Sequence, residues 1–451
     1  MSTAQPAEQG IYEEYFRLTQ EYKTKYGAKT ILLMQVGAFF EVYGLKRPNT
    51  GDVYGSSIME LSEICQLNVS EKKSNYDNSQ ILMAGFRDYT IDKYISKLVE
   101  FGYTLPVFIQ EKVGKTVKRV FDQVYSPGTI ISCETDAQSS MTNNIMCIWM
   151  ELHKPFGKTS QVMQSNTRES IVYGVSVVNI FTGKSSIFQY EAPFFMNTTT
   201  FDELDRYLSV YSPSELILIS PFEGDDLHRV VQYSGIKTGA VHQICTKNTE
   251  DKVTTKKLKR CSEQTYVKQL ISSFYAEETY NICTEFQRDT IATQSFCYLL
   301  NFIQEHNPNL VKRISIPDFD NTSTRMILAN HTLSQLNIID DAITSSKQYG
   351  NVSSVLSLLN KCSTPMGRRK FQYQLTNPTF NEEWLNTEYI MTAMFLVDEQ
   401  SHYIDAFRKL LGKVRDTEKL CRQLVSNKIY PSSLYHLYES VNIIQQVNMC
   451  L

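Results

Sequence analysis

The apolar pattern of this chain changes its period near residue 264, and that change constrains the fold more than any other feature. Before it, short β-rich runs such as residues 31–36 and 171–180 alternate with amphipathic segments such as 11–22 and 91–99. After it, apolar residues recur at helical spacing and glycine becomes rare. The sequence therefore predicts a mixed α/β N-terminal half followed by a mainly α-helical remainder.

Polar stretches divide the 451 residues into three predicted domains. Turn residues at 126–129 and a polar run over 132–144 mark the first boundary. The lysine-rich stretch 246–260 is interpreted as a solvated linker face before the second boundary. Residues 441–444 still follow a helical pattern, which indicates a final domain that is cut short. The predicted domains are 1–130 (mixed α/β), 140–262 (α/β) and 263–451 (helical).

Charge and cysteine content exclude several classes of protein. The formal net charge is -3, so any contact with nucleic acid has to be made by local clusters of basic residues. The 10 cysteines have no C-x-x-C spacing, which favours free thiols in a reducing compartment over a zinc site. No apolar run approaches the roughly 18 residues of a membrane span, and the N-terminus has no signal-peptide core. We expect an intracellular protein (cytoplasm, nucleus, organelle matrix or viral factory) with no membrane partner.

The sequence contains no recognisable catalytic site. Gly-Lys-Ser/Thr occurs at 114–116, 157–159 and 183–185, but each lacks the glycine that a phosphate-binding loop requires five positions earlier. The strand predicted over 171–180 has no carboxylate to bind the magnesium ion of a nuclease, and a neutral Asn179 lies near its end. We therefore predict no catalytic residue, no metal site and no cofactor for this chain.

The most informative short segment is Gly37-Ala38-Phe39-Phe40-Glu41, which follows the apolar run 31–36. If the extended conformation continues, Phe39 and Glu41 lie on one face of the strand, and Ala38, Phe40 and Val42 lie on the other. An aromatic wedge beside a hydrogen-bonding group is suited to testing the stacking of a base pair. The competing interpretation is a core phenylalanine beside a surface glutamate.

The Phe-x-Glu spacing is not specific by itself. It also occurs at 201–203 and 380–382, and in both places a helix is predicted to begin. Only the first copy lies at the end of a predicted strand, ahead of a loop marked by Gly44, Pro48 and Gly51.

Three blocks, in order and at compatible distances, resemble the MutS family of DNA mismatch-recognition proteins. The first is Gln35–Glu41, and the second is Met83–Phe86, interpreted as a short turn, with the segment 94–99 and a strand that ends at Gln110. The third is Ser363–Arg369 followed by Asn377-Pro378, and its Thr-Pro-Met-Gly core is the most specific part. By this resemblance, 1–130 is a mismatch-binding domain, 140–262 an RNase-H-like connector without nuclease chemistry, and 263–451 a helical core that leads into a lever.

The resemblance implies that the chain senses mispaired or unpaired bases in duplex DNA. Phe39 corresponds to the family's wedge, and Glu41 to the residue that forms a hydrogen bond with the disturbed base. Basic residues of the same domain are expected to hold the DNA backbone without reading sequence. They are Lys72, Lys73, Lys97, Lys115, Lys118 and Arg119.

Other parts of the family's architecture are not expected in these 451 residues. Family members continue with a DNA clamp, the return half of the core and an ABC-type ATPase that uses ATP and magnesium and forms the dimer. The resemblance thus implies a homodimer or heterodimer through that ATPase, and a MutL-type repair partner at the connector.

The sequence departs from the family pattern at several places. Ala38 stands where a small acidic residue is usual, and Phe86-Arg87-Asp88-Tyr89 stands where the family has Ile-Pro-Tyr-His. The first block looks most like a divergent subgroup found in large DNA viruses and some organelle genomes. Two alternatives stay open: a MutS-like protein that binds branched DNA, and an interaction scaffold that does not sense mismatches.

Overall fold

The structure is a computed structural model that describes residues 6–48, 50–113, 116–131, 142–153, 169–247, 252–319, 326, 332–339, 354–397 and 401–450. Its contacts define two compact units, the first made of Met1–Ser132 with Gly239–His242 and Phe302–Pro308, and the second of the other residues. A mixed α/β half precedes a mostly helical part, as predicted. The three-domain division itself stays a prediction. Among the described helices, none has the length and apolar character needed to cross a membrane.

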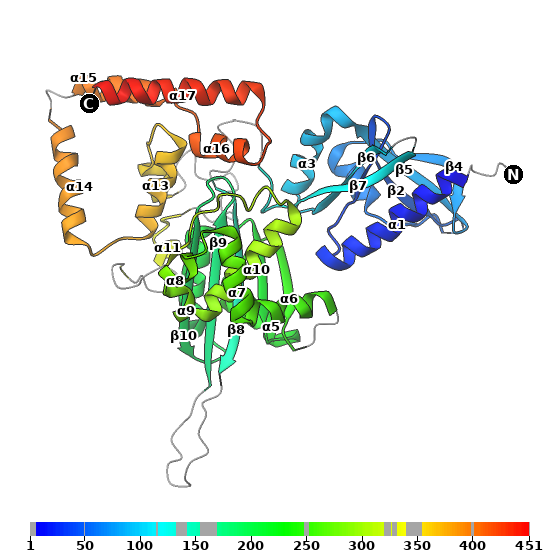
Figure 1. The fold of residues 1–451 in the computed structure, drawn as a ribbon, viewed down its shortest axis with the longest axis horizontal. Helices are drawn as coiled ribbons and strands as arrows, with labels where there is room; N and C mark the ends of the chain where they lie inside the picture. The colour runs from blue at the N-terminus through cyan, green and yellow to red at the C-terminus, as the bar shows by residue number, and fades with distance from the viewer. Residues whose placement is uncertain are drawn as a thin grey trace, which may run out of the picture. The chain divides into compact units, whose positions relative to one another are not determined.

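The first unit is built on a seven-stranded sheet (Figure 1). Its strands are β1 (Leu33–Val36), β2 (Phe39–Lys46), β3 (Val53–Tyr54), β4 (Ser70–Tyr76), β5 (Ser79–Arg87), β6 (Leu105–Val113) and β7 (Thr116–Tyr125). The strand order is β4-β5-β2-β1-β6-β7, and β3 pairs with β2. The helices are α1 (Pro6–Tyr26), α2 (Ile58–Cys65), the 3-10 helix η1 (Asp88–Thr90) and α3 (Ile91–Glu100). Met83–Phe86 lies inside β5, so its interpretation as a turn is wrong.

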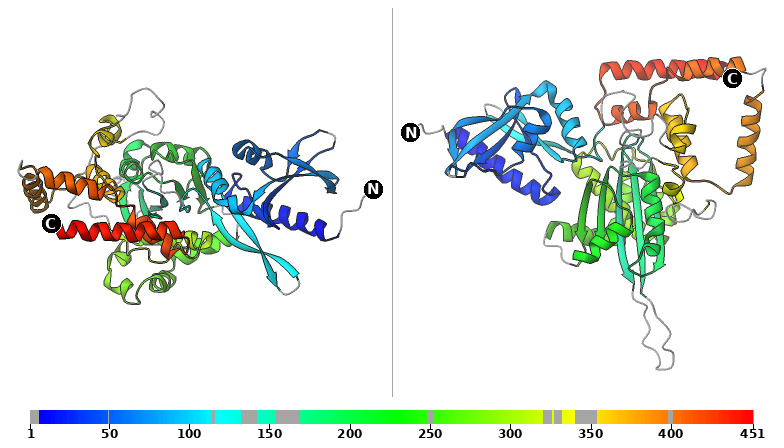
Figure 2. Two further views of the ribbon diagram at one scale, coloured as in Figure 1. Left: turned by 90° about the horizontal axis from the view of Figure 1, so that it is seen from above. Right: turned by 180° about the vertical axis from the view of Figure 1, so that it is seen from behind.

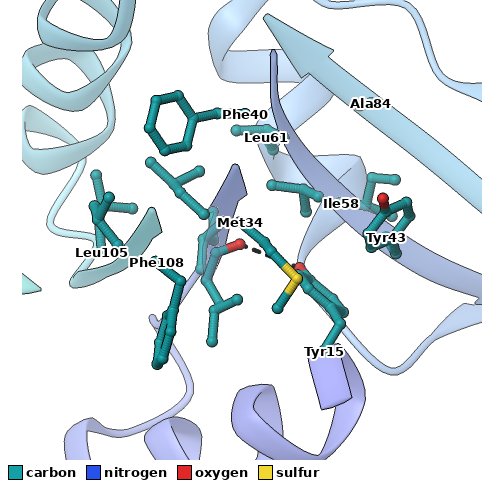
Figure 3. Packing of buried hydrophobic residues seen from close by; sticks show 14 of the residues in the cluster. Tyr15, Met34, Phe40, Tyr43, Ile58, Leu61, Ala84, Leu105 and Phe108 are labelled. Atoms are coloured by element: carbon teal, nitrogen blue, oxygen red, sulfur yellow. Dashed lines mark hydrogen bonds between the residues drawn. The ribbon is translucent and has the colours of Figure 1, made fainter. Parts of the chain in front are cut away.

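The two faces of β2 are both covered. Tyr43 packs edge-on against Tyr12 and Tyr15 of α1, with ring centroids 5.0 Å apart in each pair. Figure 3 shows Tyr43 beside Tyr15. On the other face, Gly44 lets Ile58 of α2 approach, since a Cβ at Gly44 would lie 2.6 Å from that side chain. A slip of one residue would exchange these faces, so the packing fixes the register of β2.

A second sheet has the strand order β12-β11-β8-β9-β10-β13. These strands are β8 (Asn144–His153), β9 (Ser170–Asn179), β10 (Ser185–Pro193), β11 (Glu215–Ser220), β12 (Ala240–Cys245) and β13 (Asp318–Phe319). β8, β9 and β10 form an antiparallel meander, and β11 runs parallel to β8. The helices of this region are η2 (Thr198–Phe201), α4 (Asp202–Tyr211), α5 (Gly224–Tyr233), α6 (Lys252–Ser262), α7 (Gln264–Phe274), α8 (Thr279–Ile282), α9 (Glu285–Arg288) and α10 (Thr290–His306).

Residues 252–260 of the lysine-rich stretch lie in a helix and not in a linker, although their lysines are mainly solvated as predicted. Residues 252–262 form α6, in which Leu258 and Cys261 are buried while the lysines lie mainly at the surface. The charged residues mark the solvent face of a packed helix, which sequence composition alone did not distinguish from a loop.

The N-terminal part of α10 packs directly on β9. The Ser295 hydroxyl donates a hydrogen bond of 2.7 Å to the carbonyl of Cys147 and lies 2.7 Å from the Ser176 hydroxyl. A Cβ at Gly174 would lie only 2.2 Å from the backbone nitrogen of Ala292, so this approach requires glycine. The helix and the sheet thus share one close-packed interface.

The remaining helices are α11 (Thr332–Gln335), α12 (Val355–Leu359), α13 (Pro365–Thr376), α14 (Glu382–Phe395), α15 (Ser401–Leu411), α16 (Thr417–Val425) and α17 (Pro431–Cys450). The Thr-Pro-Met-Gly block starts α13: the Thr364 hydroxyl caps the Gly367 N–H at 3.1 Å, and Pro365 occupies the first turn. Arg369, one turn further, forms paired hydrogen bonds of 2.6 and 2.8 Å with Asp416 just before α16. The block therefore begins α13, and Arg369 in the next turn of that helix binds a segment that is distant in sequence.

Candidate functional site

A two-residue turn places Phe39 at the start of β2. Val36 pairs with Phe39 across the β1–β2 hairpin, and Gly37 has a φ of 63°. Glycine with positive φ at the first turn position is typical of a type II′ hairpin turn. The extended conformation therefore does not continue through Gly37, and Ala38 lies in the turn instead of on the strand face that holds Phe40 and Val42. Phe39 and Glu41 nevertheless share one face of β2, as predicted.

The hairpin turn is braced from both neighbouring strands. On one side the Asp88 N–H donates a hydrogen bond of 3.0 Å to the Ala38 carbonyl. On the other, the Gly37 N–H donates to Gln110 Oε1 at 3.1 Å. These contacts join segments that are far apart in the sequence. They fix the backbone of the turn from which Phe39 projects.

Phe39 is exposed at this end of the sheet. Its side chain is 42% exposed, although most phenylalanines of the first unit contribute to the core. Arg87 is its partner across β5, and the guanidinium carbon lies 5.9 Å from the centre of the Phe39 ring. Two residues further on, in η1, Tyr89 is 76% exposed.

Arg87 and Tyr89 accompany Phe39 at this end of the sheet, and the sequence did not predict either residue there. Both lie in the tetrapeptide 86–89, where the sequence departs from the pattern that it otherwise resembles. That departure was the available signal, because an altered segment that pairs with the start of β2 changes what surrounds Phe39. The structure brings an exposed ring, a cation and a second exposed ring to one end of the sheet.

Glu41 is partly buried and held by its own strand. The Tyr43 hydroxyl donates a hydrogen bond of 2.5 Å to Glu41 Oε2. Gly85 is the partner of Glu41 on β5, and a Cβ there would lie 2.7 Å from the Phe40 carbonyl and 3.4 Å from Glu41 Cγ. Glycine in the second resemblance block therefore makes room for the Phe40 carbonyl, with the Glu41 side chain beside it.

The predicted backbone-binding residues lie in different places. Lys118 is exposed on β7, and Arg119 beside it is mostly buried, 4.0 Å from Glu14 of α1. Arg119 pairs with Gln110 on β6, which places it at the same end of the sheet as the hairpin turn. Lys115 lies outside the described residues.

The other predicted cations lie away from the turn. Lys72 and Lys73 are on the edge strand β4, next to the pair Glu71–Leu82. Since Leu82 and Arg87 are five residues apart on β5, these lysines are about 17 Å along the strand from Phe39. Lys97 is in the last turn of α3. Its charge acts on the Cys65 thiol: burial raises the pKa of that thiol to about 11, and the positive charge of Lys97 opposes the rise.

The described residues show no arrangement that indicates catalysis or metal binding. No group of three or more metal-ligating side chains occurs among them. The Asn179 carboxamide accepts hydrogen bonds from the N–H groups of Phe181 and Thr182, which gives it a structural role in the β9–β10 turn. A cavity of about 320 Å³ beside this turn is lined by Lys184, Arg369 and Glu418, whose charges pair with one another at 2.9 and 2.7 Å.

Comparison with known proteins matches both ends of the chain. A family model described as MutS domain I matches residues 9–134, and one described as MutS domain III matches 331–451. A DNA mismatch repair protein mutS homolog of Acanthamoeba polyphaga mimivirus is 26% identical over 97% of this chain and 39% of its own length. DNA mismatch repair protein MutS of Borreliella burgdorferi is 23% identical over 84% of the chain and 36% of its own length.

A relative that is named as a mitochondrial protein is also similar. The mitochondrial DNA mismatch repair protein mutS homolog of Sarcophyton glaucum is 22% identical over 85% of this chain and 40% of its own length. The chain thus spans about two fifths of the length of these curated relatives.

Proposed function

Since the chain belongs to the MutS family, we propose that its first unit senses mispaired or unpaired bases in duplex DNA, with Phe39 as the wedge and Glu41 as the hydrogen-bonding partner. The observation that carries the proposal is the exposed Phe39 ring directly after a braced two-residue turn. A projecting ring on a fixed backbone loses little conformational freedom when it inserts between bases.

The proposed discrimination is a difference in the cost of deforming DNA. Stacking of an aromatic ring on a base contributes roughly 1–3 kcal/mol. Bending the duplex costs on the order of 1–6 kcal/mol on smooth elastic estimates. A mispaired base is easier to unstack than a paired one, so the same wedge binds a mismatch more tightly.

Glu41 favours specificity at the expense of affinity in this proposal. A carboxylate near the phosphates opposes binding to every duplex. It contributes a favourable contact only where a disturbed base offers a hydrogen bond. The partly buried position of Glu41, two residues after Phe39, supports this role.

Cations near the hairpin turn are proposed to hold the DNA backbone. Lys118 and Arg87 are the best placed, because both lie at the Phe39 end of the sheet. Arg119 adds to the positive electrostatic potential at this end of the sheet, although the carboxylate of Glu14 lies near it. We propose more remote contacts with the DNA backbone for Lys72, Lys73, Lys97 and Lys115.

The second sheet is proposed to be the connector domain with an RNase-H-like fold. The antiparallel β8–β9–β10 meander with β11 parallel to β8 supports it. For the whole protein, we propose a MutL-type partner at the connector. We also propose that it uses ATP and magnesium and dimerises through an ATPase. An intracellular location is proposed on the same basis. The eight cysteines whose side chains the structure describes are free thiols, which supports it.

Binding of the full chain to labelled oligonucleotides at low salt tests the function. We expect tighter binding to a duplex with one G·T mispair or one unpaired base than to the matched duplex, with a salt dependence typical of phosphate contacts. Equal binding to matched and mismatched duplexes, with a preference for four-way junctions, would identify a branched-DNA binder instead. Absence of salt-dependent DNA binding would identify a scaffold.

Replacement of Glu41 separates specificity from affinity. In Glu41→Ala, we expect binding to the matched duplex to be equal or tighter, because a negative charge near the phosphates is gone. The preference for a mismatch should fall by about tenfold, which is the size of one hydrogen bond to a charged group. Fluorescence anisotropy titrations of both duplexes measure the two effects. A uniform loss on all DNA would show that Glu41 supports folding instead.

A further inference from the structure

Helix α6 carries a row of exposed basic side chains on the face opposite its buried side. Leu258 and Cys261 are buried, and Asn301 Nδ2 of α10 donates a weak hydrogen bond of 3.8 Å to Cys261 Sγ. Figure 1 and the right-hand view of Figure 2 show α6 at the edge of the second unit. The exposed basic residues recur at i, i+4, i+7 and i+8: Lys252, Lys256, Lys259 and Arg260.

These four residues form one continuous stripe, called here the α6 basic face. At 3.6 residues per turn, the positions i, i+4, i+7 and i+8 lie within about a third of the helix circumference. Leu258 and Cys261 lie on the other side of the helix, where they attach it to the unit. The packing of α6 therefore directs the basic face to solvent.

The charges of the α6 basic face are not neutralised by the part of the fold that the structure describes. The helix itself contains no aspartate or glutamate. Within the described ranges, none of the four residues forms an ion pair, and the exposed Glu263 that follows the helix pairs with none of them. Glu250 and Asp251, which precede the helix, lie outside the described residues. Like charges three and four residues apart repel one another on a helix, and a bound polyanion would relieve that repulsion.

The composition of the face favours a nucleic acid over a protein or a membrane. Protein-binding surfaces are enriched in aromatic residues and depleted in lysine, whereas three of these four residues are lysines and none is aromatic. A basic helix that lies on a membrane inserts its apolar side. The apolar side of α6 is already used, because Leu258 and Cys261 are buried in the unit.

The length of the face suits a DNA strand. Lys252 and Arg260 are eight residues apart, which corresponds to about 12 Å along the helix axis. Each strand of duplex DNA presents one phosphate per about 3.4 Å of its axis, so about three to four successive phosphates extend over that length. Lysines act toward phosphates as flexible point charges, which tolerate small differences between the two spacings.

We propose that the α6 basic face is a second DNA-binding surface, which holds the phosphate backbone of a duplex without reading its sequence or its mispairs. The face belongs to the second unit, whereas Phe39 belongs to the first. Contacts with phosphates alone supply affinity and carry no information about the bases. The proposal therefore goes beyond mismatch recognition and does not depend on the wedge.

Acetylation of lysines, measured by mass spectrometry, locates the contact on the full chain. We expect a matched duplex at low salt to slow the acetylation of Lys252, Lys256 and Lys259 by about threefold or more, since phosphates would cover their amines. Lys361 and Lys409 are exposed elsewhere in the second unit and should react at unchanged rates. Equal rates with and without DNA at all five lysines, or equal protection of all five, would overturn the proposal.

Replacement of all four residues by glutamine measures what the face contributes. The slope of log K against log salt changes by about 0.9 for each phosphate contact, so we expect it to become shallower by about 3. At low salt, affinity should fall by at least about tenfold for matched and mismatched duplexes alike, which leaves their ratio unchanged. Glutamine has a helix propensity close to that of lysine, and the repulsion is gone. The urea unfolding midpoint should therefore be equal or higher.

A second fourfold glutamine variant is the matched control, since it changes the net charge by the same amount at exposed lysines that do not share one helix. Its positions are Lys361, Lys370, Lys409 and Lys413. Here the salt slope should change by less than about 1. Equal losses in the two variants would show that total charge, and not the α6 basic face, determines binding.

Two further outcomes separate this proposal from its alternatives. If the wild-type chain binds labelled polyglutamate but no DNA, the face binds an acidic protein and the proposal is wrong. If the wild-type chain binds matched and mismatched duplexes equally, but loses affinity and salt slope when the four residues of α6 are replaced, the proposed mismatch recognition fails and the α6 basic face stands.

Discussion

Phe39→Ala is expected to abolish the preference of the chain for mismatched over matched duplex DNA. The loss of stacking on one base corresponds to about 1–3 kcal/mol, or roughly 5- to 150-fold in the affinity for a mismatch. Binding to the matched duplex should change little, because the ring is not inserted there. Parallel titrations with a G·T duplex and its G·C counterpart measure the ratio of the two dissociation constants.

Phe101→Ala provides the matched control for this variant. Phe101 follows α3 in the same unit and is 54% exposed, so both substitutions remove an exposed phenylalanine ring. Neither should lower the unfolding free energy by more than about 1 kcal/mol. Only the change at Phe39 should remove the mismatch preference. A preference that survives in Phe39→Ala, or that is lost equally in Phe101→Ala, would refute the wedge assignment.

Gly174→Ala is expected to be the most destabilising single substitution of this set. The added Cβ would lie 2.2 Å from the nitrogen and 2.5 Å from the Cα of Ala292, and backbone atoms of a packed helix have no free space to move into. The start of α10 has to shift away from β9, at a cost of about 3 kcal/mol. The urea unfolding midpoint, compared at constant slope, measures the loss.

Gly239→Ala is the corresponding control for the glycine substitution. No heavy atom lies within 4 Å of a Cβ built at Gly239, and its φ is outside the left-handed region. The unfolding free energy should therefore change by less than about 0.5 kcal/mol. Similar midpoints for the two variants would mean that α10 tolerates displacement, and that the close approach to β9 contributes little.

Local pattern was enough to predict the face shared by Phe39 and Glu41. Side-chain alternation holds in any strand, and Phe39 to Glu41 lies within one strand. The turn at Gly37-Ala38 was not predictable from the same residues, since Gly37 is compatible with both extended and turn conformations. The contacts that select the turn come from Asp88 and Gln110, which lie more than 45 residues away in sequence.

The order of fold classes was also predictable, while some elements were not. The change of period near residue 264 predicted the transition from α/β to mostly helical structure, and the structure has it. Met83–Phe86 contains a glycine and resembled a turn, but pairing with β2 makes it a strand. The glycine is required there by the approach of the Phe40 carbonyl rather than by chain reversal.

Residues of the site that depend on cross-strand pairing could not be assigned from the sequence. Arg87 approaches Phe39 because β5 pairs with β2, and Tyr89 follows because η1 begins where β5 ends. Arg119, which was expected to contact DNA, approaches Glu14 in the structure because helix α1 packs near β7, and the sequence does not show that contact either. Charge alone does not show which basic residue already has a partner.

Fluorescence of 2-aminopurine placed directly beside a G·T mispair tests the wedge most directly. The analogue is quenched when it is stacked in the duplex and brightens when a neighbouring step is opened. We expect the wild-type chain to increase this fluorescence on the mismatched duplex only, and Phe39→Ala to give no increase even at protein concentrations that saturate the DNA. An equal increase with Phe39→Ala, or tight mismatch-specific binding of the wild-type chain without any increase, would contradict the insertion of Phe39 into the base stack.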